Sequence, residues 1–482
     1  MYRFQFIFLL GIVFQMSAQE VIVSKEMSIR SDYAYEILGP IDDNILLFRD
    51  RGVDKFIASF DEDLQFNWEQ KLLFEEKRVK VYGLSPQDSF FTIFYGLKKD
   101  GIEYLKAANY DKNARMQDSI VIAQEDKNLV GQDFQFVSSL KKNKTLLYYI
   151  DNAEKFRVFI YDHKKDTLDW QAEYILEGGN LYLDIADIYM TETGSIVMLL
   201  EKNHARSGPK REGAQILILE KGNENGYITN IDYGKTSMQS IKMSVDEKNT
   251  RIGFFGLYNS KKANWSEGYC FKFIDLNRFN DLYIPEYRPF SIKLVEDIYG
   301  SEAKKKKGLN FFSLSDIIWR QDGGMIVAME MQRQFSRRNS YDTAVRTTSD
   351  FYTGSRGWVD YFNEDIVLTA LHPNGELHWQ KMLFKKQFSQ DDGGIFSSYF
   401  PFMTPSRLRL IFNDQIKANN TVSEYVINGV GKYKRESLFS TEYQNLRLRF
   451  VDALQISPTS LLVPSQKNYN LSLVKISYDE EG

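Results

Sequence analysis

Short apolar runs recur along the chain, and polar segments separate them at a nearly regular spacing. Residues 89–95, 145–150 and 195–200 are apolar or aromatic at most positions. Such near-continuous runs predict strands that are buried on both faces of a sheet. Aromatic residues make up 15% of the chain, which also favours strands over helices.

One turn is repeated along the chain, and it sets the expected architecture. Residues 60–68 align with residues 371–379 without a gap, and residues 161–170 form a third copy that is one residue longer. Each copy is a β-rich run, a polar turn and a second β-rich run that opens on a tryptophan. Self-similarity of this kind predicts a β-propeller of four-stranded antiparallel blades, in which the turn joins the third strand (C) to the outer strand (D).

The tryptophans of this turn are expected to be structural. They are Trp68, Trp170 and Trp379. Stacking on a ligand is the alternative, but the three residues occupy the same place in their blades. We therefore expect them to pack between neighbouring blades, where a large flat side chain fits.

The spacing of the C–D turn gives the number of blades. Similar turns follow one another at about 50 to 58 residues, except for one gap of nearly twice that length. The marker residues are Asp61, Asp111, Asp162, Glu220, Asp275, His372, Asn428 and Asp479. In the long gap we expect one blade with insertions, with strands at 311–319, 325–331 and 365–371. The count is eight blades, and seven is the alternative if one marker is false.

The two ends of the chain predict how the ring closes. The last turn, at Asp479, has no strand D after it, and the strand at 21–27 has no blade before it. If the N-terminal segment supplies strand D of the last blade, no sheet edge is left open.

Insertions are expected mainly on one face of the propeller. Residues 201–213, 259–268 and 332–363 fall between strands B and C of neighbouring blades, and residues 291–308 form a further insert. The B–C inserts are rich in arginine and aromatic residues, which dominate protein–protein hot spots. A solvated loop without a partner is the alternative. The candidate partner-binding residues are Arg206, Lys210, Arg211, Trp265, Arg337, Arg338, Arg346, Tyr352, Arg356 and Trp358.

The N-terminus predicts export. Residues 1–18 contain a basic start, an apolar stretch and a small-residue exit, the layout of a secretory signal peptide. A buried first strand is the alternative. No later segment approaches 18 apolar residues, so we expect no membrane insertion. Residues 19–482 are expected to form a single soluble propeller domain in the periplasm, with an association with the outer membrane left open.

Composition excludes several kinds of site. The net charge of −4 is small for 482 residues, so nucleic acid is not an expected partner. The single cysteine, Cys270, excludes a disulfide framework and a cysteine-based zinc cluster, and its alternating surroundings predict a buried thiol. The four histidines lack metal-ligand spacing. We predict neither a metal nor a cofactor, and no catalytic residue.

Four short stretches resemble the corresponding parts of uncharacterised exported β-propeller-like proteins of Bacteroidota. They are residues 361–367, 377–379, 390–394 and 397–399. The leader ending in Ser17-Ala18-Gln19 is similar to those of exported proteins from the same phylum. The resemblance implies a propeller fold and an exported location, and it implies no activity.

Two functions from different classes remain. The first is a non-enzymatic binding or scaffolding propeller, which docks on a protein complex of the cell envelope, such as an outer-membrane translocon, through its long loops. The alternative is a glycan-binding or glycan-processing enzyme with a carboxylate pair at the central channel. The candidate carboxylates for that alternative are Asp316, Asp322, Asp391 and Asp392.

Overall fold

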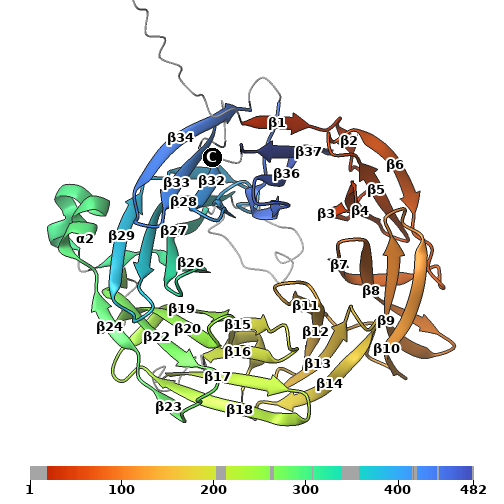
Figure 1. Cartoon of the computed structure of the whole chain (residues 1–482), viewed down its shortest axis with the longest axis horizontal. Helices are drawn as coiled ribbons and strands as arrows, with labels where there is room; N and C mark the ends of the chain where they lie inside the picture. Colours follow the sequence, from red (N-terminus) through yellow and green to blue (C-terminus); the bar gives the residue numbers. More distant parts are fainter. Residues whose placement is uncertain are drawn as a thin grey trace, which may run out of the picture.

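The computed structural model describes residues 19–177, 179–201, 213–260, 265–306, 308–337, 358–414, 416, 421–441 and 445–479. In this part of the chain, eight four-stranded antiparallel sheets surround a central axis and form a β-propeller (Figure 1). The predicted all-β fold with eight blades is confirmed, and the alternative of seven blades is wrong.

The first four blades follow one another in sequence, each beginning with its innermost strand. They consist of β3 (Ala34–Ile41), β4 (Asn44–Arg51), β5 (Asp54–Phe60) and β6 (Phe66–Lys71); β7 (Val79–Pro86), β8 (Phe90–Lys99), β9 (Ile102–Asp111) and β10 (Met116–Glu125); β11 (Gln135–Ser138), β12 (Lys144–Asp151), β13 (Lys155–Asp162) and β14 (Thr167–Ile175); and β15 (Ile185–Met190), β16 (Ile196–Glu201), β17 (Gly213–Glu220) and β18 (Asn223–Asp232).

The last four blades have the same strand order, except that the outer strand of the eighth blade comes from the N-terminus. They consist of β19 (Ser237–Asp246), β20 (Arg251–Asn259), β22 (Gly268–Asp275) and β24 (Glu286–Pro289); β26 (Phe312–Trp319), β27 (Met325–Arg337), β28 (Trp358–Leu371) and β29 (Leu377–Leu383); β31 (Phe400–Met403), β32 (Arg407–Asn413), β33 (Thr421–Asn428) and β34 (Tyr433–Ser440); and β35 (Leu454–Gln455), β36 (Ser460–Lys467), β37 (Asn470–Ser477) and β1 (Glu20–Val23).

Shorter elements fill the connections between these strands. They are β2 (Met27–Ser28), β21 (Trp265–Ser266), β23 (Leu282–Tyr283), β25 (Leu309–Asn310), β30 (Gln387–Gln390), the helices α1 (Leu181–Asp184) and α2 (Ile292–Tyr299), and the 3₁₀ helices η1 (Gly300–Lys305) and η3 (Phe450–Asp452).

The ring closes as predicted, through the N-terminal strand. β1 pairs antiparallel with β37, with Val21 opposite Ile476 and Val23 opposite Val474 (Figure 1). The expected strand at 21–27 is divided into β1 and β2, which both pair with β37. Between them, the Ser24 hydroxyl accepts the Leu473 backbone N–H at 2.9 Å, so the ladder is interrupted without leaving this donor unpaired.

The repeated C–D turn has one geometry, which explains its sequence pattern. In the first blade, Oδ1 of Asp61 accepts hydrogen bonds from the backbone N–H groups of Asp63 (3.0 Å) and Gln65 (2.7 Å). The same two contacts recur at Asp111 and at Asn428. Each of these loops also contains one residue with positive φ. A short acceptor side chain at the first position therefore fixes the loop and the register of the two strands.

The apolar core lies between the blades. One cluster joins Leu46 and Phe48 of the first blade to Phe91 and Ile93 of the second, and all four side chains are buried. The tryptophans of the C–D turn extend this contact. Trp170 donates its indole N–H to the carbonyl of Gly194 in the next blade, and Trp379 donates to that of Gly429. Because every blade shares its core with both neighbours, no blade is stable as an isolated unit.

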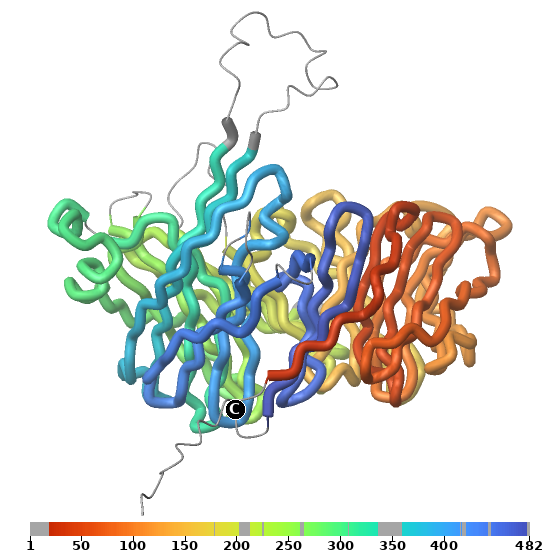
Figure 2. Tube along the Cα trace, turned by 90° about the horizontal axis from the view of Figure 1, so that it is seen from above, coloured from red at the N-terminus to blue at the C-terminus, as the bar shows by residue number. Residues whose placement is uncertain are grey.

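The sixth blade differs from its predicted boundaries. β27 extends to Arg337, and β28 begins at Trp358. The sequence pattern had predicted that strand B ends at 331 and that strand C begins at 365. Residues 332–337 and 358–363 are paired with each other, and β30 pairs with β28 along the same stretch. These strands rise above the body of the ring (Figure 2), and buried positions among them, such as Asp360 and Gln387, are polar, which is why they lack the apolar run of a blade strand.

The insert at 291–308 contains regular structure. Ser291 caps α2 by accepting the Leu294 backbone N–H, and η1 includes Lys304 and Lys305. The chain then forms β25, which pairs with β21 in the B–C loop of the fifth blade. The two inserts of neighbouring connections therefore hold each other in place.

Deleting the closing strand is expected to open the ring. A protein that starts at residue 29 lacks β1 and β2 and leaves the apolar clusters on both sides of β37 uncovered. Val21, Ile22, Val23 and Met27 are half-buried, so each contributes about 1 kcal/mol. We expect the melting temperature to fall by about 4 °C or more, with aggregation, relative to a protein that starts at residue 19. Equal melting temperatures would contradict closure by β1.

His163 forms a buried polar contact between the second and third blades. Its Nδ1 lies 3.1 Å from the Thr92 hydroxyl and its Nε2 lies 2.8 Å from the Thr145 hydroxyl. The side chain is 6% exposed, and this burial lowers the pKa of His163 to about 4. The folded protein therefore holds the neutral imidazole, whereas the unfolded chain binds a proton below pH 6.5.

Stability should thus fall as the pH decreases from about 6.5 to 4. The pKa of His163 is lower in the folded protein than in the unfolded chain. Its contribution to the free energy of unfolding is therefore fully present above the unfolded pKa and is lost on acidification, by roughly 2.5 kcal/mol near pH 4.5. In urea unfolding, His163→Gln should be less stable than wild type at pH 7 and lose less stability on acidification. Parallel pH profiles for the two proteins would contradict this assignment.

Candidate functional site

The two faces of the ring carry different connections. We call the face that holds the B–C loops and the D–A connections between blades the B–C face. The extension of β27 and β28 rises from this face, and α2 and η3 lie in its D–A connections (Figure 2). The opposite face holds the A–B and C–D turns, which are short in most blades.

Three of the predicted partner-binding residues lie in the described part of the chain. Trp265 begins β21 and is half-buried, and its carbonyl accepts the side-chain amide of Asn259. Arg337 ends β27 and is paired in register with Trp358, which begins β28. The other seven predicted residues lie outside the described residues. They are Arg206, Lys210, Arg211, Arg338, Arg346, Tyr352 and Arg356.

Aromatic and charged side chains stiffen the extension of the sixth blade. Phe362 is central, with Phe335 on one side at 5.8 Å and Phe388 of β30 on the other at 5.0 Å between ring centroids. The guanidinium of Arg333 lies 5.2 Å from the Phe362 ring and forms an ion pair with Glu364. Contacts between three strands thus replace the neighbouring blades that the extension lacks.

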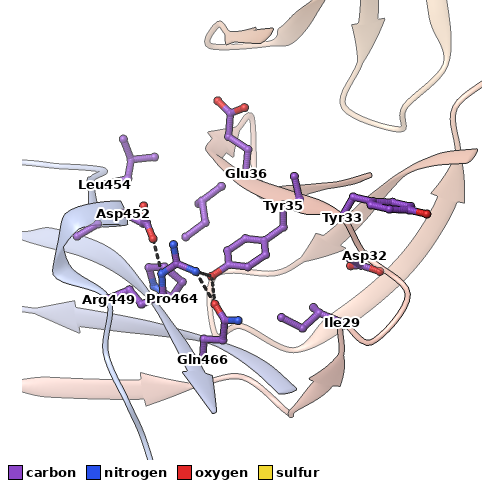
Figure 3. A pocket seen from close by; sticks show the side chains of 13 residues that line it. Ile29, Asp32, Tyr33, Tyr35, Glu36, Arg449, Asp452, Leu454, Pro464 and Gln466 are labelled. Carbon is purple, nitrogen blue, oxygen red and sulfur yellow. Dashed lines mark hydrogen bonds and ion pairs between the residues drawn. The ribbon is translucent and has the colours of Figure 1, made fainter. Parts of the chain in front are cut away.

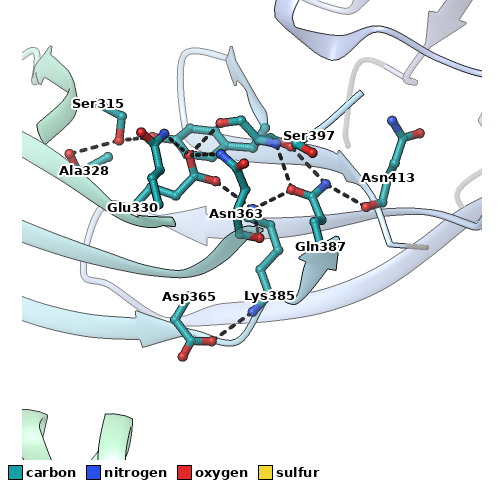
Figure 4. A network of polar contacts seen from close by, with 12 residues as sticks. Ser315, Ala328, Glu330, Asn363, Asp365, Lys385, Gln387, Ser397 and Asn413 are labelled. Atoms are coloured by element: carbon teal, nitrogen blue, oxygen red, sulfur yellow. Dashed lines mark hydrogen bonds and ion pairs between the residues drawn. The ribbon is translucent and has the colours of Figure 1, made fainter. Parts of the chain in front are cut away.

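A buried ion pair fixes the base of the extension. Nζ of Lys385 lies 2.6 Å from Oε1 of Glu330 on β27, and both side chains are fully buried (Figure 4). Lys385 also donates to the carbonyl of Asn363 at 3.0 Å and to Oε1 of Gln387 at 2.6 Å. One ammonium group therefore ties β27, β28 and the connection after β29 together.

The second oxygen of Glu330 is satisfied as well. Its Oε2 accepts hydrogen bonds from the side chains of Gln332 (2.7 Å), Asn363 (3.3 Å) and Ser398 (2.7 Å). Burial lowers the pKa of Lys385, and the adjacent Glu330 carboxylate opposes that shift. A charge pair that is fully hydrogen-bonded in this way is tolerated in a protein interior, and it holds the surrounding strands in one arrangement.

The carboxylates considered for glycan chemistry are distributed over different parts of the molecule. Asp316 accepts the hydroxyl of Tyr399, and Asp322 pairs with Arg320 in an A–B turn. On the B–C face, Asp391 accepts the Val359 backbone N–H, and Asp392 forms an ion pair with Arg447. Each of these four carboxylates already has a partner within the fold, so their arrangement gives no support to a catalytic pair.

Exposed apolar side chains are frequent on the B–C face. They come from the B–C and D–A connections around the ring. The residues are Tyr33, Val53, Leu73, Tyr182, Leu183, Ile292, Phe335, Phe384, Val451 and Tyr469. Single exposed apolar residues are ordinary on a protein surface, and others occur on the outer strands, such as Val121, Ile175 and Tyr227.

A cavity of about 540 Å³ opens on the B–C face between the eighth and first blades (Figure 3). Its walls come from the D–A connection and the first residues of β3, from η3 and β35, and from the end of β36. The polar residues that line it are Asp32, Tyr33, Tyr35, Glu36, Arg449, Asp452 and Gln466. Its volume lies within the range of small-ligand pockets.

Arg449 is the centre of a closed set of contacts in this cavity. Its Nε pairs with Asp452 at 2.5 Å, and its Nη1 donates to the Tyr35 hydroxyl at 2.9 Å and to Gln466. The Tyr35 hydroxyl donates in turn to Gln466 at 3.2 Å. Burial raises the pKa of Tyr35 to about 12, so this hydroxyl stays protonated.

The described residues were also searched for a metal site and for a membrane-spanning helix. No cluster of three or more histidine, cysteine or acidic side chains there could hold a metal ion. No helix among them is long and apolar enough to cross a membrane. Cys270 is fully buried, as its alternating surroundings predicted, and burial raises its pKa.

Sequence reasoning missed the residues that organise this face. Glu330 could have been recognised from the sequence, because it is a charged residue inside the apolar run 325–331. Lys385 and Glu36 gave no such signal, since lysines and glutamates are normally solvated and their partners depend on distant parts of the chain.

Comparisons with known proteins show the fold alone. No protein-family model matches this chain, and no curated protein matches it. Among solved structures, it is similar to the Dos1 propeller (7% identity, 94% of each chain, TM-score 0.44). It is also similar to a europium-containing methanol dehydrogenase (10% identity, 95% of this chain and 93% of the other, TM-score 0.42). A third is the β-propeller domain of the trilobed protease from Pyrococcus furiosus (10% identity, 87% and 98%, TM-score 0.37).

Separating the buried ion pair is expected to destabilise the protein strongly. Lys385→Met leaves the Glu330 carboxylate buried without its cation, which should lower the free energy of unfolding by about 3 to 5 kcal/mol. Lys385→Met combined with Glu330→Gln removes both charges and should recover most of that loss. Urea unfolding of the three proteins measures this coupling. If the double variant is no more stable than Lys385→Met, the loss of charge pairing is not the reason for the instability of the single variant.

Proposed function

We propose that this protein is a non-catalytic propeller that docks on another protein of the cell envelope through its B–C face. The extension of β27, β28 and β30 carries the proposal. It projects from the ring, and its base is held by the Lys385–Glu330 pair and by Gln387 of β30, which donates to the Asn413 carbonyl of the seventh blade at 2.7 Å. An element that is anchored at its base and presented to solvent suits a preformed contact, because little conformational entropy is lost on binding.

The surroundings of the extension support the same proposal. The exposed apolar side chains of the B–C face lie in connections around the ring, so a partner of protein size could cover several of them at once. The predicted signal peptide supports a partner in the cell envelope, and a membrane-embedded complex such as an outer-membrane translocon is our proposed partner.

Variants on the two faces test the proposal. Phe384→Ser with Val451→Ser changes two exposed side chains of the B–C face, and Leu140→Ser with Val430→Ser changes two exposed side chains in turns of the other face. In affinity capture from mildly solubilised envelopes, we expect the first pair to weaken recovery of the partner about thirtyfold, which equals about 2 kcal/mol. The second pair should bind as wild type does.

Two results would contradict docking through the B–C face. One is the recovery of the bait alone with the wild-type protein. The other is an equal loss of binding for both pairs of variants. Melting temperatures of all variants need to stay within a few degrees of wild type, so that a change in capture reports on the surface.

A further inference from the structure

Three side chains at the base of the extension bring a carboxyl group, a primary amide and an amine together. They are Glu330 of β27, Asn363 of β28, and Lys385 in the connection between β29 and β30. Nζ of Lys385 lies 2.6 Å from Oε1 of Glu330, and Nδ2 of Asn363 lies 3.3 Å from Oε2 of the same group. One carboxyl group thus contacts both the amine and the amide (Figure 4).

The amine also lies close to the amide carbon of Asn363. Nζ of Lys385 donates to the backbone carbonyl of Asn363 at 3.0 Å. Since this oxygen and Cγ belong to one residue, the amine is within a few ångströms of Cγ. Two atoms react from a separation of about 3 to 3.5 Å, and rotation of the Asn363 side chain covers the remaining distance.

Glu330 is held in the position that a proton shuttle needs. The side chains of Gln332 and Ser398 both donate to its Oε2 at 2.7 Å, so the carboxyl group is fixed in place. Its Oε1 faces the amine, which has to lose protons, and its Oε2 faces the amide nitrogen, which has to leave. A carboxyl group between these two nitrogens suits general acid–base catalysis of acyl transfer.

Burial favours the form of the amine that reacts. Only a neutral amine is a nucleophile, and an exposed lysine is almost fully protonated near pH 7. The side chain of Lys385 is fully buried, and this burial lowers its pKa, whereas the Glu330 carboxylate opposes the shift. In a site without water, transfer of one proton from Nζ to Oε1 removes two unsolvated charges at once.

Gln387 is a second amide that contacts the amine. Its Oε1 lies 2.6 Å from Nζ of Lys385. Its Nε2, however, donates to the backbone carbonyls of Ser398 and Asn413. That nitrogen faces two acceptors and receives no proton with which to leave, so Asn363 is the better acceptor for the amine.

We propose that Lys385 and Asn363 form an isopeptide bond, with Glu330 as the catalytic acid and base. Glu330 takes a proton from the Lys385 ammonium, and the neutral Nζ attacks Cγ of Asn363 to form the Nζ–Cγ bond. Glu330 then delivers one proton to Nδ2 and removes the second from Nζ. The Cγ–Nδ2 bond breaks, and ammonia leaves with the proton that Glu330 still holds. No electrons are gained or lost, so the reaction needs no oxidant.

The isopeptide bond fastens the base of the extension. The ion pair of Lys385 and Glu330 is the state of these residues before the reaction. The bond closes a loop from residue 363 to residue 385, which contains the end of β28 and all of β29. The chain has one cysteine and so cannot form an internal disulfide. An amide cross-link restricts the unfolded chain in the same way.

The intact mass of the wild-type protein tests the bond directly. A protein that starts with methionine before Glu20 avoids cyclisation of Gln19, which also releases ammonia. Its mass should be about 17 Da below the value calculated from the sequence. A tryptic digest should contain a branched peptide that joins Asn363 to Lys385, because trypsin does not cleave after an acylated lysine. Tandem mass spectrometry identifies the two linked residues.

Four variants separate the roles of the side chains. Lys385→Met and Asn363→Ala each lack one reactant, and both should have the full calculated mass. Glu330→Gln keeps both reactants and should slow the reaction at least about a hundredfold, so that the freshly purified protein also has the full mass. Gln387→Met is the control, and it should lose ammonia as wild type does.

The outcomes are decisive without reference to docking. The full calculated mass for wild type, or a mass loss that maps to another pair of residues, would overturn the bond. So would a loss that persists in Asn363→Ala, or one that is as complete in Glu330→Gln as in wild type. Because the wild-type mass alone shows whether the bond exists, a variant that fails to fold does not leave the question open. Docking is judged separately, from the capture experiment with Phe384 and Val451.

Discussion

The pairing of β1 with β37 is the contact on which the rest of the ring depends. Each of the first seven blades forms from one continuous segment, so short turns bring its strands together. The eighth blade takes three strands from residues 454–477 and its outer strand from residues 20–23. Each apolar layer is shared by two blades. An incomplete eighth blade would therefore expose apolar side chains of the seventh and first blades and leave a sheet edge unpaired. Closure is therefore a condition for packing throughout the molecule.

Closure by the distant N-terminus also shapes the candidate site. The chain must pass from the outer strand of the eighth blade to the inner strand of the first, through residues 29–33. This connection is held by Asp32, which is buried between Arg49 and Arg51. On the other side of the seam, η3 leads into the short strand β35. The cavity lies between these two connections, and so the feature that completes the fold also creates a pocket on the B–C face.

The sequence allowed local features to be predicted and hid those that depend on distant contacts. The C–D turns were recognisable because an acceptor side chain such as Asp61 and a residue with positive φ determine their geometry within five residues. The extension of β27 and β28 was read as a loop, since the positions that it buries, such as Asp360 and Gln387, are polar and give no apolar alternation. Lys385 and Glu330 are 55 positions apart, and only the fold brings them together. Nothing in the sequence marks Glu36, because the pairing of its neighbours Asp32, Arg449 and Asp452 arises only in the fold.

Two carboxylates of the B–C face illustrate how a structural charge differs from a functional one. Glu330 is fully buried, yet Lys385 and three hydrogen-bond donors satisfy both of its oxygens, so the fold itself accounts for the charge. Glu36 is less buried and has no partner, so the fold gains nothing from its ionised form. Local rules that a structure breaks without internal compensation point to an interaction with another molecule.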